Sequence, residues 1–100
     1  MSDFCLVLLC PASVEEKLLD VLLGPMGDKG FTSVSAFSHG PARGRLSSLE
    51  QVMGRSATVQ VQVLVTEEQM NDLLQRLRNE FHGTGLRYWA SPVAVEGEIE

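Results

Sequence analysis

The chain has 100 residues, 44% hydrophobic and 21% charged, which is enough for one packed domain and too few for two. The net charge of -5 argues against general nucleic-acid binding, a function that favours a basic face. The apolar stretch 4–9 is too short to cross a bilayer and no basic segment precedes it, so we expect a cytoplasmic protein.

The first part of the chain predicts a strand, a helix and a second strand. Residues 4–9 are continuously apolar, as in a strand covered on both faces. Ser13, with Glu16 three residues later, is typical of a capping box, and Gly24 with the proline after it ends the predicted helix. A weaker strand is predicted over residues 31–38.

A long loop and a clear strand follow. The segment 39–55 has no clear hydrophobic period and contains several glycines, so we interpret it as a loop. Residues 57–65 alternate valine with polar side chains, the pattern of a half-buried strand.

The second helix has the stronger start signal. Thr66 with Gln69 forms a capping-box pattern, and the apolar stripe predicts a helix up to about Phe81. Residues 86–92 are predicted as the last strand, and the acidic tail 96–100 as solvated.

The two cysteines, Cys5 and Cys10, lie five residues apart on one predicted strand. At roughly 3.3 Å per residue they are too far apart to form a disulfide, and they point to opposite faces. We therefore expect free thiols.

This order of elements predicts one domain over residues 1–100, an α+β ferredoxin-like β-α-β-β-α-β sandwich. Its antiparallel sheet has four strands, with both helices on one face. Strand 4–9 is apolar on both sides, and Phe31 and Phe37 share one side of the second strand. The apolar surface left uncovered predicts oligomerisation through the open face.

Two segments resemble the PII signalling proteins. One is 29–32 (Lys-Gly-Phe-Thr) leading into 36–40, and the other is 83–85 (Gly-Thr-Gly) followed by 86–88. The resemblance covers residues 4–95. It implies a homotrimer whose sheets line a central barrel, with adenine-nucleotide sites between subunits. It also implies that the long loop contacts a membrane transporter or an enzyme.

The chain departs from the usual PII pattern at three places. Leu86 stands where PII proteins usually have a lysine, and the loop 39–55 contains no tyrosine for nucleotidylation. Acidic residues occupy the C-terminal region where PII proteins have arginines. The closer resemblance is to an uncharacterised PII-like group often encoded beside heavy-metal efflux pumps, which implies an efflux pump component as another partner.

The candidate sites follow from these segments. The loop carries three arginines against Glu50, a charge that favours an anionic ligand or an acidic partner surface over a merely solvated loop. The glycine segment either presents N–H groups to a phosphate or caps the helix. The candidate ligand-binding residues are Lys29, Gly30, His39, Gly40, Gly83, Thr84, Gly85 and Arg87, and the partner-binding residues are Arg43, Arg45 and Arg55.

A metal site is the weaker alternative. Its candidate ligands are His39, His82 and Cys10, but they lack the close spacing of known zinc motifs. A buried cysteine and surface histidines explain them equally well.

No catalytic motif is present, so we expect a binding protein and not an enzyme. The leading hypothesis is a trimeric PII-like regulator that senses a nucleotide or another small anion. The alternative is a metal-binding accessory protein of a heavy-metal efflux or tolerance system. The candidate cofactors are accordingly an adenine nucleotide or a transition metal.

Overall fold

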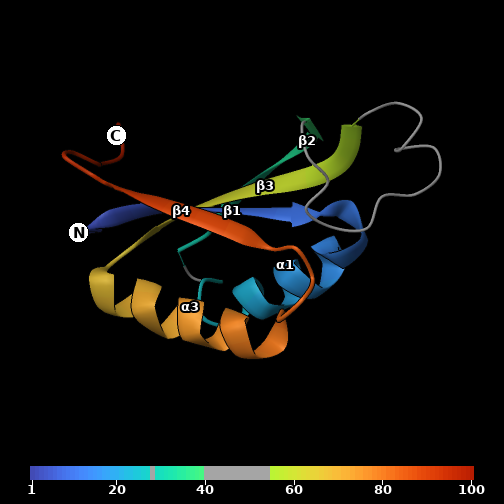
Figure 1. Cartoon of the computed structure of the whole chain (residues 1–100). Coiled ribbons are helices and arrows are strands. Elements are labelled where there is room, and N and C mark those ends of the chain that lie inside the picture. The colour runs from blue at the N-terminus through green and yellow to red at the C-terminus, as the bar shows by residue number, and fades with distance from the viewer. Residues whose placement is uncertain (28, 40–54) are drawn as a thin grey trace.

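The computed structural model describes residues 1–27, 29–39 and 55–100, and its elements follow the predicted β-α-β-β-α-β order (Figure 1). The elements are β1 (Phe4–Pro11), a 3-10 turn (Ala12–Val14), α1 (Glu15–Leu23), β2 (Thr32–His39), β3 (Arg55–Val65), α3 (Glu67–Glu80) and β4 (Arg87–Pro92).

The four strands form one antiparallel sheet in the order β2-β3-β1-β4. The central strand β1 pairs with β3 on one side and β4 on the other, so that Leu6 lies opposite both Val63 and Ala90. Because successive side chains of a strand point to opposite faces, the continuous apolar run of β1 places apolar groups on both faces at the centre of the sheet.

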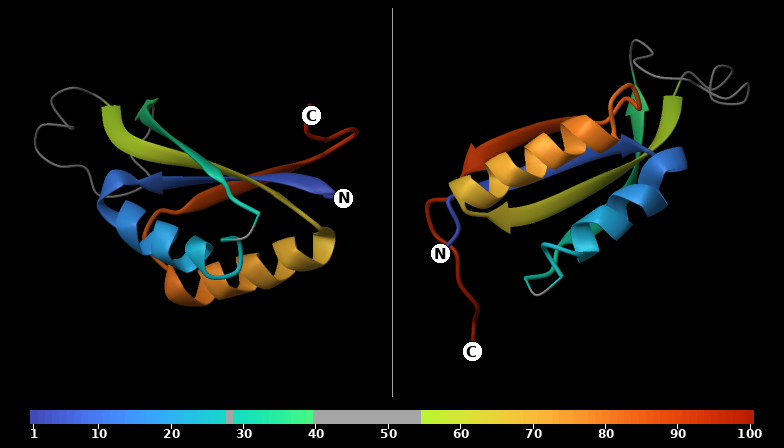
Figure 2. Two further views of the ribbon diagram at one scale, coloured as in Figure 1. Left: turned by 180° about the vertical axis from the view of Figure 1, so that it is seen from behind. Right: turned by 90° about the horizontal axis from the view of Figure 1, so that it is seen from below.

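Helices α1 and α3 cover one face of the sheet, as predicted (Figure 2). Every second residue of β1 and β3 points into this layer, and Leu6, Leu8, Val61 and Val65 are fully buried there. Burying one such side chain contributes about 1.5–3 kcal/mol, so this layer is the main source of stability.

The two helices begin differently. At α3 the predicted capping box is confirmed: Thr66 Oγ1 accepts from the Gln69 N–H at 3.2 Å, and the Thr66 N–H donates to Gln69 Oε1 at 2.9 Å. At α1 the predicted cap is wrong. Ser13 lies inside the 3-10 turn that follows Pro11, and no side chain caps α1. An N-cap residue needs a non-helical backbone conformation. Ser13 lacks this conformation because it lies within the 3-10 turn.

The open face of the sheet carries apolar and uncharged polar side chains. Val7, Val34, Leu64 and Trp89 lie on it, and Arg87 is its one charged residue among the described strand residues. Phe31 and Phe37, which we counted from the sequence toward the uncovered apolar surface, do not lie on this face.

Phe31 precedes β2 and packs against the core, and Phe37 has the same parity, so it also faces the helix side. Phe37 remains 55% exposed because β2 is an edge strand that the helices do not fully cover.

Both cysteines are free and lie on opposite faces of β1, Cys10 in the core and Cys5 on the open face. Within the described residues, no helix has the length and apolar character needed to span a membrane.

Candidate functional site

Most predicted site residues gather at one end of the sheet. There β1 and β2 end, β3 and β4 begin, and the glycine segment 83–85 follows α3 (Figure 1). His39 pairs with Arg55 across β2 and β3, and Arg87 pairs with Leu9. We call this the loop end. Of the predicted residues on the segment 39–55, Gly40, Arg43 and Arg45 lie outside the described residues.

Lys29 and Gly30 lie at the opposite end. Lys29 Nζ is 3.3 Å from Gln69 Oε1 and 3.5 Å from Ser2 Oγ, beside the first turn of α3. The glycine segment follows the last turn of the same helix. Because α3 has 14 residues, its ends are about 20 Å apart at about 1.5 Å per residue. One phosphate group cannot contact both places within one chain.

The glycine segment forms a hydrogen-bonded turn at the end of α3. Thr84 Oγ1 donates to the Phe81 carbonyl at 2.7 Å, and the Thr84 N–H donates to it at 3.2 Å. Gly83 and Gly85 have φ of 78° and 88°, which other residues rarely adopt. The segment therefore acts as a helix cap, and a role in phosphate binding stays a prediction.

Arg55 stacks on an aromatic ring at the loop end. Its guanidinium carbon lies 4.1 Å from the centroid of the Phe37 ring, a cation–π contact. The Arg55 Nε atom is buried and has no hydrogen-bond partner among the described residues. The Phe37 ring thus holds the guanidinium next to the segment 40–54, and its Nε–H group is a donor that no described residue uses.

The predicted metal ligands do not converge within the part of the chain that the structure describes. No group of three or more His, Cys, Asp or Glu residues there could hold a metal ion. Cys10 is fully buried. Desolvation and the nearby Glu15 charge raise the pKa of its thiol from 9.0 to about 11, although a hydrogen bond with the Val59 backbone lowers it. A metal binds the thiolate, so Cys10 is a poor ligand.

Sequence reasoning missed a groove between α3 and β4. It is lined by Leu77, Phe81 and Leu86, with Arg78 and Tyr88 at its edge. The apolar stripe of α3 was visible in the sequence and was interpreted as core. Its proximity to the first residues of β4 depends on how the strand returns past the helix, which the periodicity of the helix does not specify.

Comparison with known proteins gives a family match over the whole chain. The family described as "Protein of unknown function (DUF3240)" matches residues 1–100. No curated protein sequence matches significantly.

Three solved structures share the fold. A DUF3240 family protein from Shewanella baltica OS155 has a TM-score of 0.79 and 17% identity, covering 100% of this chain and 99% of that one. CPII from Thiomonas intermedia K12, a nitrogen regulatory PII-like protein bound to ADP, AMP and bicarbonate, has a TM-score of 0.72 and 20% identity, covering 99% and 98%. The apo form of CPII has a TM-score of 0.60 and 18% identity, covering 93% and 90%.

Proposed function

We propose that this chain, which belongs to the DUF3240 family, is a PII-like regulatory protein that binds a nucleotide or another small anion and thereby modulates a partner protein. The observation that carries the proposal is the likeness of fold to CPII, a nitrogen regulatory PII-like protein bound to ADP, AMP and bicarbonate, over 99% of this chain. The protein acts in the cytoplasm and has no catalytic role of its own.

The active form in this proposal is a homotrimer joined through the open faces of the sheets. The support is the character of that face, on which Val34 is 58% exposed and Trp89 is 43% exposed. Arg87 is the one charged strand residue described there, and it lies at the strand's beginning. An exposed apolar face with few charges is typical of a surface that binds another protein chain.

The effector binds between subunits at the loop end, where Arg87 and the glycine segment supply a positive charge and backbone N–H groups. The segment 39–55, with Arg43, Arg45 and Arg55, presents its positive charge to an acidic surface of a partner such as a membrane transporter or an efflux pump component. Regulation requires only that the effector binds two states of this segment with different affinity.

A ligand screen by thermal shift tests the proposal, with ADP, AMP, ATP and bicarbonate run beside Cu⁺, Ag⁺, Zn²⁺ and Ni²⁺. A ligand at about a hundredfold excess over its dissociation constant stabilises the folded state by about 2.7 kcal/mol. We expect a nucleotide or bicarbonate to do so, and Arg87→Gln to weaken the effect while the matched variant Arg76→Gln does not. A response to metals alone would replace the proposal with a metal-binding accessory function, and no response at all would overturn it.

A further inference from the structure

A groove of about 230 Å³ lies within one protomer, between the C-terminal half of α3 and the beginning of β4. Its wall is apolar, and three of the wall residues, Leu8, Leu77 and Phe81, are at most 4% exposed. Its edge is polar. The edge residues are Arg78, His82, Gly83 and Tyr88.

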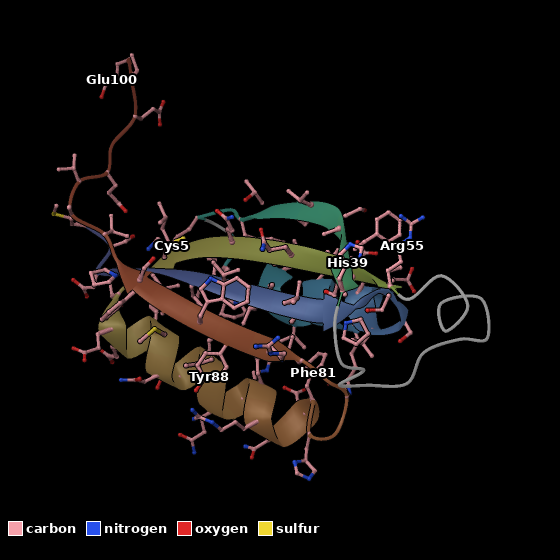
Figure 3. The ribbon with its side chains drawn as sticks, turned by 45° about the horizontal axis from the view of Figure 1, so that its top comes forward. Cys5, His39, Arg55, Phe81, Tyr88 and Glu100 are labelled. Carbon is pink, nitrogen blue, oxygen red and sulfur yellow. The ribbon has the colours of Figure 1, made fainter. Side chains whose placement is uncertain are left out.

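Arg78 and Tyr88 close the edge of the groove together. Arg78 Nη2 donates to the Tyr88 hydroxyl at 3.2 Å, and the Tyr88 side chain extends from β4 toward α3 (Figure 3). No carboxylate pairs with Arg78 among the residues that the structure describes. Arg76, two positions earlier on the same helix, is paired with Glu80 at 2.7 Å. Arg78 therefore keeps its charge and most of its donors available at the edge of the groove.

Contacts from α1 and from the turn after α3 hold Phe81 in the wall of the groove. Lys17 Nζ lies 4.7 Å from the centroid of the Phe81 ring and donates to the Glu80 carbonyl at 2.8 Å, which links α1 to this end of α3. Thr84 ties the following turn to the Phe81 carbonyl at 2.7 Å. These contacts fix the position of Phe81 in the absence of any ligand, so the apolar wall is formed in advance.

We propose that this groove binds a small amphipathic anion, a monocarboxylate with an apolar chain or ring, whose carboxylate meets Arg78. An apolar cavity of about 150 Å³ holds benzene, so a groove of about 230 Å³ accepts a body of about six to eight carbons. The cationic edge selects a negative head group because guanidinium binds carboxylate with two parallel hydrogen bonds. The groove lies on the helix side within one protomer, so it requires neither the proposed trimer nor a nucleotide site.

The test uses hexanoate as the probe, with hexanol, hexylamine and acetate as matched compounds, and follows backbone amide signals of the full chain by NMR. Hexanoate is expected to shift signals of residues 74–88 in a saturable way. Hexanol lacks the charge, hexylamine has the wrong sign and acetate lacks the apolar body, so each is expected to bind at least about tenfold more weakly.

Two variants, each of an exposed arginine of α3, decide the role of the edge. Arg78→Gln is expected to weaken hexanoate binding about tenfold, while Arg76→Gln, which removes a paired arginine of the same helix, leaves it unchanged. Equal binding of hexanoate and hexanol, shifts spread over the open face of the sheet, or unchanged affinity in Arg78→Gln would each overturn the inference. Thermal unfolding of both variants shows that they remain folded.

Discussion

Lys17 of α1 lies over the ring of Phe81 at the end of α3, with its Nζ atom 4.7 Å from the ring centroid. The same ammonium group donates to the Glu80 carbonyl at 2.8 Å, which is one of the carbonyls left free at the helix C-terminus. A single exposed lysine therefore joins the two helices at the loop end, where the chain turns into the glycine segment.

Replacing Lys17 by methionine should lower the free energy of unfolding by about 1 kcal/mol. The change keeps the apolar stem and removes both the cation–π contact and the charge beside the helix C-terminus. Urea unfolding followed by circular dichroism measures the loss. Lys17→Arg serves as the control because it keeps the cation, and an equal loss in both variants would show that the charge is not what matters.

Thr66→Ala should destabilise the protein by about 1 kcal/mol, because it removes the acceptor for the Gln69 N–H in the capping box. Thr66→Ser keeps the hydroxyl and should retain most of the stability. The two variants are compared by chemical unfolding under the same conditions. The prediction is contradicted if Thr66→Ala loses no more than Thr66→Ser.

The two helix starts explain why the fold was predictable from the sequence and one boundary was not. At Thr66 the residue types, the preceding strand and the apolar stripe all agree, and the cap forms as predicted. At Ser13 the residue types fit equally well, but the chain leaves β1 at Pro11 and turns at once into a 3-10 segment. The direction in which the chain leaves β1 determines the backbone conformation at Ser13, and the capping pattern of residue types carries no information about that direction.

Cys10 should make the protein less stable at alkaline pH. Its pKa is raised from 9.0 to about 11 in the folded state, so between these values the unfolded chain loses the thiol proton and the folded chain keeps it. Stability from this group is therefore fully present below pH 9 and is lost as pH rises toward 11, by on the order of 2 kcal/mol.

Cys10→Val removes the titrating group from the core, so its stability should fall less over this range when both proteins are unfolded in urea at a series of pH values. Identical pH profiles for the two proteins would contradict the assignment. The same burial predicts that a thiol reagent labels Cys10 only when the protein unfolds.

The candidate site was predictable only in part, because motifs do not specify distance. The glycine segment and Arg87 were identified from a resemblance and do lie at one end of the sheet, near His39 and Arg55. Lys29 was grouped with them, although the 14 residues of α3 separate it from the glycine segment. The groove beside Arg78 had no sequence signal, since an arginine in the last turn of a helix is also what the helix dipole favours.

The open face of the sheet can be tested with two adjacent residues of β2. Val34 and Ser35 are both exposed, but alternation along the strand places Val34 on the open face and Ser35 on the helix side. If the open face joins subunits, Val34→Lys should bury a charge in the interface and shift the protein to monomers, whereas Ser35→Lys should leave the assembly intact. Light scattering after gel filtration gives the molar mass of each variant. A monomeric parent protein, or equal masses for the two variants, would remove the proposed trimer interface from this face.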